Sequence, residues 1–213
     1  MRVLFVILIL CFITACSSSP NEPKTVVDWT NFLEWNNQQY IGNPSLFVSN
    51  PSYMGRSVGT TSFHVQKHVQ DASYQPKNGD AAFLPEGTAL HAVKNVSTKQ
   101  VLAVSTQRVY TTKTFHSPSL KQATITRIQI TNEGKTIFST SDPLTIETIQ
   151  SILDEGAEEE LPTTTSSPHS YLIYFTLSSP LSLKYTLHEL DGMFYLEKEK
   201  SIRLPEEFSF YVN

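Results

Sequence analysis

The stretch "YLIYFTLSSPLSLKYTLHELDGMFYLEKE", residues 171–199, decides the fold class. Its first segment, residues 171–177, is apolar on both faces, which is typical of a central strand with a helix packed over one side. The next segment, residues 181–190, alternates with the period of a strand. Asp191-Gly192 after it is the strongest short signal for a hairpin turn. We expect Leu181, Leu183, Tyr185 and Leu187 to point inward, and Lys184, Thr186 and His188 to point outward.

The segments just before this stretch predict a hairpin and the clearest helix of the chain. "ATITRIQITNEGKTIFST", residues 123–140, reads as two strands around an Asn-Glu-Gly turn. "SDPLTIETIQSILDEG", residues 141–156, starts with Asp142 as N-cap and Pro143 at the first helical position, and Gly156 follows as a stop. The helix is expected to bury the apolar stripe Ile146, Ile149, Ile152 and Leu153.

The order of these elements sets the architecture of residues 117–213. Two strands, one helix and further strands follow each other, and "EFSFYVN", residues 207–213, predicts a closing strand through Phe208, Phe210 and Val212. Such an order is typical of an antiparallel sheet with one helix across it. The sequence therefore predicts an α+β fold, mainly antiparallel β, with a packed helix at about residues 142–155.

Residues 57–114 predict short strands separated by turns. "SFHVQKHVQ", residues 62–70, alternates like a strand, and turn signals stand at residues 78–80 and 85–87. Many short strands punctuated by Gly and Pro indicate a small barrel or a curled sheet. The N-terminal part of the fold, residues 26–116, is therefore expected to be rich in β-structure.

Two interpretations remain open for "VVDWTNFLEWNNQQYIG", residues 26–42. Asn36-Asn37 tolerates the positive φ of a two-residue hairpin turn. The aromatic spacing also suits a helix over residues 28–39. In both cases Phe32, Trp35 and Tyr40 are expected to be core residues rather than a platform for a ligand.

The N-terminus carries a processing signal. The apolar run Val3–Ile13 is shorter than the roughly 20 residues that span a bilayer, and its length and flanks fit a secretory signal peptide. Ile13-Thr14-Ala15-Cys16 resembles the lipobox of bacterial lipoproteins. The resemblance implies that the chain is cut before Cys16 and that this cysteine is acylated. The alternative is a generic exported protein cleaved near Cys16.

Four regions follow from this interpretation: a lipoprotein signal peptide (1–15), a flexible tether (16–25), a β-rich domain (26–116) and an α+β domain (117–213). The tether lacks apolar residues from Ser17 to Lys24, so it has nothing to pack. Cys11 leaves with the signal, so the mature chain keeps one cysteine and forms no internal disulfide. Its fold must be held by an apolar core alone.

A second resemblance concerns "LPEGTALHAV", residues 84–93. It is similar to Leu-Pro-x-Gly-Thr segments of uncharacterised surface lipoproteins from Gram-positive bacteria, and it implies no site residues. This likeness favours the extracytoplasmic face of a cell membrane. Ser17 directly after Cys16 also permits sorting to the periplasmic face of an outer membrane.

The net charge of the chain limits the classes of partner that it can bind. The formal net charge of −4, which becomes −5 when Arg2 leaves with the signal, argues against nucleic acid and against polybasic docking on lipid. Membrane contact is therefore expected through the lipid on Cys16. The two chains of a diacylglycerol suffice for stable anchoring.

Motifs for catalysis, cofactors and metals are missing from the sequence. It contains no Gly-x-Ser-x-Gly, His-Glu-x-x-His, Cys-x-x-Cys or phosphate-cradling loop. His64 and His68 would lie about 13 Å apart on a strand, too far for one metal ion. His188 and Glu189 would point to opposite faces, so His188 is expected to be solvated. The acidic cluster Asp154, Glu155, Glu158, Glu159 and Glu160 lacks the spacing of a calcium loop.

We therefore expect no cofactor, no metal and no catalytic residue, and a binding or accessory module at the envelope with an envelope protein as partner. The alternative is an envelope hydrolase whose site is assembled from scattered residues such as His64, His91, Asp80 or Glu86. A deep polar pocket would favour the hydrolase. An uncovered sheet edge or an exposed apolar patch would favour the binding module.

The lipobox yields the first test. Mass spectrometry of the mature N-terminus should find Cys16 as first residue with a diacylglycerol attached. Cys16→Ala should abolish the acylation, because the thiol that carries the lipid is lost, whereas Cys11→Ala should change neither the acylation nor the cleavage site. An unmodified Cys16, or cleavage at another bond, would contradict the prediction.

Overall fold

The computed structural model describes residues 27–162, 169–198 and 200–212, so the predicted signal peptide, Cys16 and the whole predicted tether lie outside the described residues. Within the described part, 15 strands form one sheet, and its main path runs β10-β9-β12-β13-β2-β8-β7-β6-β3. The ladders along this path are all antiparallel. The predicted α+β fold, mainly antiparallel β, is confirmed.

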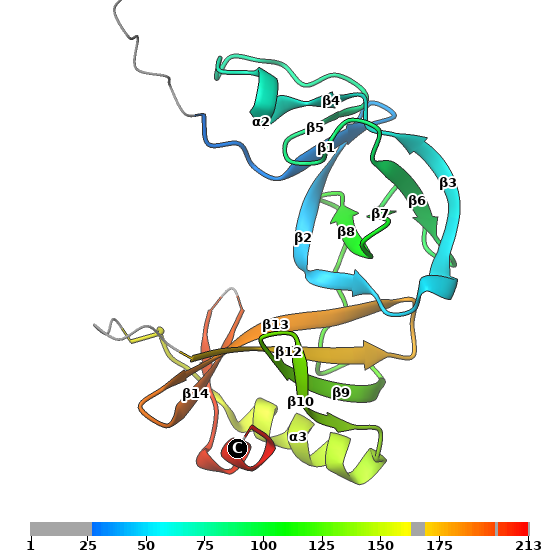
Figure 1. Ribbon diagram of the computed structural model, residues 1–213. Helices are drawn as coiled ribbons and strands as arrows, with labels where there is room; N and C mark the ends of the chain where they lie inside the picture. Colours follow the sequence, from blue (N-terminus) through cyan, green and yellow to red (C-terminus); the bar gives the residue numbers. More distant parts are fainter. Residues whose placement is uncertain (1–26, 163–168, 199, 213) are drawn as a thin grey trace, which may run out of the picture.

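The strands after residue 117 form the lower part of the molecule in Figure 1. Both predicted hairpins are present, and their turns have positive φ at Glu133-Gly134 and at Asp191-Gly192. The strands are β9 (Ile125–Asn132), β10 (Lys135–Thr140), β11 (Ala157–Glu158), β12 (His169–Leu177), β13 (Leu181–Leu190), β14 (Met193–Glu197) and β15 (Ile202–Arg203).

The predicted helix is α3 (Pro143–Glu155). The Asp142 carboxylate accepts a hydrogen bond from the backbone N–H of Thr145 at 2.8 Å, as an N-cap should. Gly156 ends the helix for a reason other than a left-handed turn: its φ is −60°, and a Cβ there would meet Arg203 O at 3.0 Å. A glycine is needed because β15 passes so close. No helix in the described ranges is long and apolar enough to cross a membrane.

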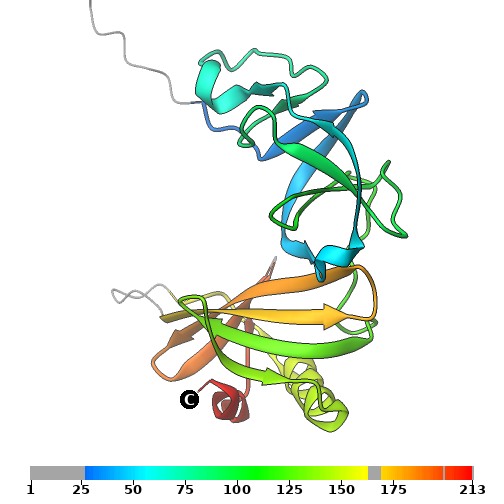
Figure 2. The same ribbon diagram turned by 45° about the vertical axis from the view of Figure 1, so that its right-hand side comes forward.

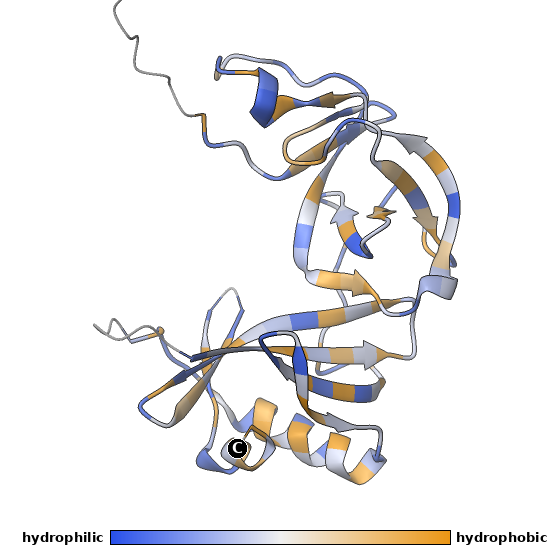
Figure 3. Cartoon of the chain, in the orientation of Figure 1, coloured by the Kyte–Doolittle hydropathy of each residue, from blue (hydrophilic) through white to orange (hydrophobic). Residues whose placement is uncertain are grey.

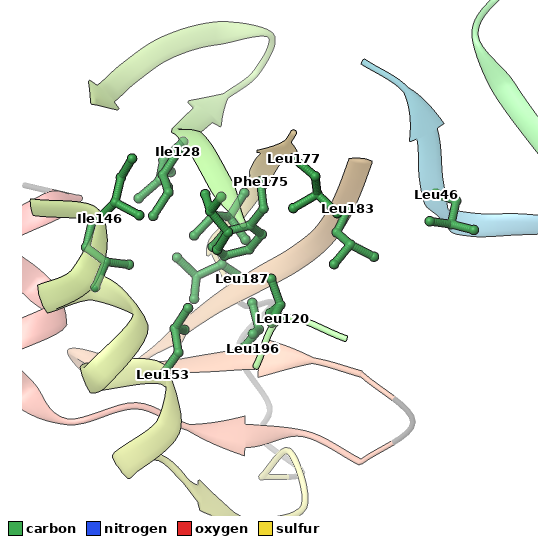
Figure 4. Close-up of a cluster of buried hydrophobic side chains, with 14 of the residues drawn as sticks. Leu46, Leu120, Ile128, Ile146, Leu153, Phe175, Leu177, Leu183, Leu187 and Leu196 are labelled. Atoms are coloured by element: carbon green, nitrogen blue, oxygen red, sulfur yellow. The ribbon is translucent and has the colours of Figure 1, made fainter. Parts of the chain in front are cut away.

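The main core lies between α3 and the lower sheet. In the views of Figures 1 and 2 this sheet lies between the helix and the upper part of the molecule. Figure 3 shows hydrophobic and hydrophilic segments following each other along α3, and its predicted apolar stripe is buried. Figure 4 shows the core side chains gathered on the inner faces of β9, β12 and β13. Leu46 and Val48 of β2 join the same cluster.

Residues 27–116 form the upper part of Figure 1. The hairpin interpretation of Asn36-Asn37 is confirmed, with φ of 51° and 57°, and the competing helix over residues 28–39 is wrong. The elements are β1 (Phe32–Trp35), β2 (Gln38–Val48), η1 (Pro51–Tyr53), β3 (Met54–Thr60), β4 (Phe63–His64), α2 (Val65–His68), β5 (Asp80–Ala81), β6 (Ala89–Val93), β7 (Val101–Val104) and β8 (Arg108–Thr111).

The upper strands curl without closing into a hydrogen-bonded barrel. The sheet path ends at β3, whose one ladder among the described strands is with β6. Trp35 of β1 packs against Gly59 of β3, where any Cβ would collide with the indole ring. The Trp35 side chain thus fills the space where a ladder to β3 would close a barrel. Of the two predicted forms, a small barrel or a curled sheet, the structure has the curled sheet.

The predicted strand over residues 62–70 is wrong beyond His64. The chain turns into α2, where Val69 N–H donates to Val65 O at 2.8 Å. Val65 is fully buried in a small cluster with Phe32 and Ala82. Val65 and Val69 are four residues apart, so the same pattern suits a helical turn, and burial of Val65 decides between the two periods.

The predicted closing strand over residues 207–213 is also wrong, because Glu206–Tyr211 form the 3-10 helix η2. With three residues per turn, Phe208 and Tyr211 lie on the same side, and both are part of the main core or packed against it. Phe210 is left 81% exposed. A strand would have aligned Phe208 with Phe210 and lost the contact of Tyr211 with Phe138, whose rings lie 5.2 Å apart.

The buried stripe of α3 gives a stability test. Ile149 is 0% exposed, so Ile149→Ala removes core contacts and should lower the free energy of unfolding by about 3 kcal/mol. Leu144 on the same helix is 73% exposed, and Leu144→Ala should change it by less than about 0.5 kcal/mol. Urea unfolding of both variants checks the difference. Equal losses would mean that the helix does not pack as described.

Candidate functional site

The candidate site is a gap along one edge of β13. On that edge β13 first pairs with β2, from Leu181↔Val48 to Leu183↔Leu46. It then pairs with β14, starting at Thr186↔Glu197. Between these ladders Lys184 and Tyr185 have no strand partner on this side among the described residues, although β12 pairs with them on the other side. We call this gap the notch.

A cavity of about 1000 Å³ opens at the notch. Such a volume is at the upper end of the range for small-molecule sites. Residues from six strands and two connecting segments line it: Asn43, Pro44, Ser45, Ser117, Glu158, Leu172, Leu183, Lys184, Tyr185, Thr186, Glu197, Lys198, Lys200 and Ile202.

The β2 wall of the notch is built by a register shift. β2 pairs with β8 up to Asn43 and again at Phe47, so the residues between them leave that ladder. Pro44 has no N–H to offer a ladder and suits such a bulge. Asn43 holds the bend, because its side chain accepts from Ser45 N–H at 3.1 Å and donates to Ser117 Oγ at 3.3 Å.

Lysines dominate the charge at the notch. Lys198 Nζ lies 5.6 Å from the centre of the Tyr185 ring, and Lys200 forms an ion pair with Glu158 at 2.8 Å. Burial lowers the pKa of Lys198, partly offset by Asp154, and burial raises the pKa of Tyr185. Among the described residues, Lys184 and Lys198 form no ion pair.

A hydrogen-bonded row of three side chains borders the notch. Ser170 Oγ lies 3.0 Å from His188 Nδ1, and His188 Nε2 lies 3.2 Å from Glu197 Oε2. Glu197 also lines the cavity. The prediction of a solvated His188 is wrong, because its side chain is only 14% exposed and is bonded at both nitrogens. His188 does point away from the helix side, as predicted.

Sequence reasoning missed this row because its members are distant along the chain. Ser170 and His188 are directly opposite across the β12–β13 ladder, and Glu197 comes from β14. The alternation placed His188 outward, but only the register of three strands could supply its partners. Tyr195, opposite His188 on β14, is fully buried, and its hydroxyl has no hydrogen-bond partner.

Of the four residues suggested for a scattered hydrolase site, three have separate partners and the fourth, His64, has an unpartnered ring nitrogen. Asp80 accepts hydrogen bonds from Tyr74 Oη and Lys77 N–H, both at 2.7 Å. Glu86 contacts His68 at 3.3 Å, and His91 Nδ1 lies 3.3 Å from Gly55 O. His64 Nε2 is buried without a partner. No hydrogen bond or ion pair joins any two of these four described residues.

Three of the five residues of the acidic cluster at the end of α3 pair with cations from other elements. Asp154 pairs with Lys121, Glu158 with Lys200 and Glu159 with Arg203. Within the described part of the chain, no group of three His, Cys, Asp or Glu side chains is arranged to hold a metal ion.

Comparison of the chain with protein-family models, with curated proteins and with solved structures finds no match.

The Tyr74–Asp80 contact predicts a pH effect in the upper part. Burial, together with the hydrogen bond to Asp80, raises the pKa of Tyr74 to about 12. An unfolded tyrosine titrates near about 10, so between these values the unfolded state loses its proton first, and the free energy of unfolding falls as pH rises.

Tyr74→Phe should weaken this alkaline loss of stability, which urea unfolding at a series of pH values measures. Tyr53→Phe is the control, because Tyr53 makes no hydrogen bond to a carboxylate in the described residues. An unchanged alkaline slope in Tyr74→Phe would show that another group causes it.

Proposed function

We propose that the chain is a lipid-anchored envelope protein that acts as a binding or accessory module, with the notch as its ligand site. The observation that carries the proposal is the unpaired edge of Lys184 and Tyr185 inside a cavity of about 1000 Å³. Backbone groups that lack a partner are strong hydrogen-bonding groups. An exposed sheet edge is a common mode of recognition.

The anchor part of the proposal rests on the N-terminal sequence. The lipobox-like Ile13-Thr14-Ala15-Cys16 supports attachment to the extracytoplasmic face of the cell membrane, or to the periplasmic face of an outer membrane. The partner is then a component of the envelope rather than nucleic acid, which the acidic net charge disfavours.

Blocking the notch tests the binding role. Thr186→Trp places a large ring in the cavity, and Thr148→Trp places the same ring on the exposed face of α3. The acylated protein is cross-linked in native membranes, and the envelope material that is cross-linked to it is measured. The Thr186→Trp variant should be cross-linked to at least about tenfold less of this material than the wild type. Thr148→Trp should recover it in full. Equal recovery by both variants would refute the notch as binding site.

Ester hydrolysis is the second candidate function, and the row Ser170–His188–Glu197 favours it. A proton on His188 Nε2 would be held by Glu197, which leaves Nδ1 free to take the Ser170 proton during attack on a carbonyl. The distances of 3.0 Å and 3.2 Å fit these two roles.

A fluorophosphonate probe distinguishes the two functions. If the chain is a hydrolase, the probe should label Ser170, and both Ser170→Ala and His188→Ala should abolish labelling. Ser139→Ala, at an exposed serine on β10, serves as the matched control. Labelling that survives Ser170→Ala would exclude this row as the nucleophile site.

A further inference from the structure

We propose that the notch takes an extended peptide segment with acidic side chains, which adds as a short strand to the edge of Lys184 and Tyr185. The inference rests on the proposed function and names the chemistry of its ligand. Its two parts are the backbone edge, which selects an extended polypeptide, and the lysines, which select carboxylates.

The backbone edge is the first part of the argument. In an antiparallel ladder each residue directs its N–H and C=O to one side, and neighbouring residues direct theirs to opposite sides. β12 uses one of these sides along Lys184 and Tyr185. One donor and one acceptor of this dipeptide therefore face the notch, where no described strand pairs with them. A peptide backbone matches this donor and acceptor pair.

The flanking strands limit the length of the ligand strand. β2 ends its ladder at Leu183 and β14 begins its ladder at Thr186. At a rise of about 3.3 Å per residue, this gap leaves room for about two residues of added strand. A long strand, such as one from a second copy of the chain, therefore does not fit. A single extended segment can pair along the short edge and leave the notch through the cavity.

The lysines are the second part of the argument. Lys184 is itself part of the unpaired edge, and Lys198 follows β14 at the next wall. Both glutamates that line the cavity have partners, since Glu158 pairs with Lys200 and Glu197 with His188. Lys184 and Lys198 are therefore the charged side chains of the described cavity lining that have no ion-pair partner in the described residues. Lys198 is only partly exposed and lies against the Tyr185 ring. A partly desolvated cation is stabilised by an incoming opposite charge.

The faces of the strand set the spacing of the acidic residues. Successive side chains of a strand point to opposite faces, so Lys184 and Tyr185 lie on opposite faces of β13, and Lys198 lies over the Tyr185 ring. We therefore expect acidic residues at neighbouring positions of the segment, one directed toward each lysine. The lining residue Leu172, which is 37% exposed, offers an apolar contact beside them.

Peptide selection tests the inference on the full chain in detergent micelles. A display library of random heptapeptides is selected on the wild type, on Lys184→Glu/Lys198→Glu and on the control Lys113→Glu/Lys135→Glu. The control lysines are exposed and do not line the cavity. Wild type and control should enrich peptides with neighbouring Asp or Glu residues, and the notch variant should enrich Lys or Arg instead.

Backbone recognition is tested with the enriched acidic peptide itself. Methylation of its amide nitrogens at alternate positions removes donors without changing charge, and one of the two possible patterns should weaken binding by about tenfold. Lys184→Glu/Lys198→Glu should weaken binding of the unmethylated peptide by at least about tenfold. Isothermal titration calorimetry measures both.

Three results would overturn the inference. They are selection of the same peptides by wild type and notch variant, absence of any enriched acidic peptide, and full binding of both methylated forms. If a glycerol phosphate oligomer binds instead and Thr186→Trp abolishes its binding, the peptide inference fails while the notch stands as a ligand site. If Thr186→Trp affects no ligand, the proposed function fails as well.

Discussion

The fold depends on the short ladder between β2 and β13. Three residue pairs, from Leu181↔Val48 to Leu183↔Leu46, join the strands of residues 27–116 to those of residues 117–213. Leu46 and Leu183 bury their side chains in the same core cluster as the apolar stripe of α3. Without this ladder the main path of the sheet would break into two pieces. The ladder lies beside the register shift of β2 against β8, between Asn43 and Phe47.

The same ladder creates the notch. The ladder of β2 with β13 ends at Leu46, within the register shift between Asn43 and Phe47 in the ladder of β2 with β8, and the ladder of β14 with β13 stops at Glu197. Neither ladder reaches Lys184 and Tyr185. The unpaired edge is therefore a consequence of topology, and loosely packed side chains are not needed to explain it.

Local chemistry explains what could be predicted from the sequence. The turns at Asn36-Asn37 and Asp191-Gly192 and the cap at Asp142 depend on residues close in the chain, and all three are present. The segments around Val65 and Phe208 were predicted wrongly, since an apolar spacing that suits a strand also suited a helical turn, and contacts with distant residues decided between them. The notch and the row Ser170–His188–Glu197 depend on the register of several strands, which no local pattern encodes.

The uncovered edges of the sheet differ in a way that bears on function. The outer strands β10 and β3 both carry register shifts, and β10 starts with Lys135. Bulges and charges of this kind discourage pairing with other chains. The edge at Lys184 and Tyr185 shows no register shift against β12, so its backbone keeps the regular geometry that a further strand requires. It is protected instead by the ends of β2 and β14, which admit a short segment and exclude a long strand. An edge that is regular but recessed is suited to selective binding, whereas the irregular outer edges are suited to preventing aggregation.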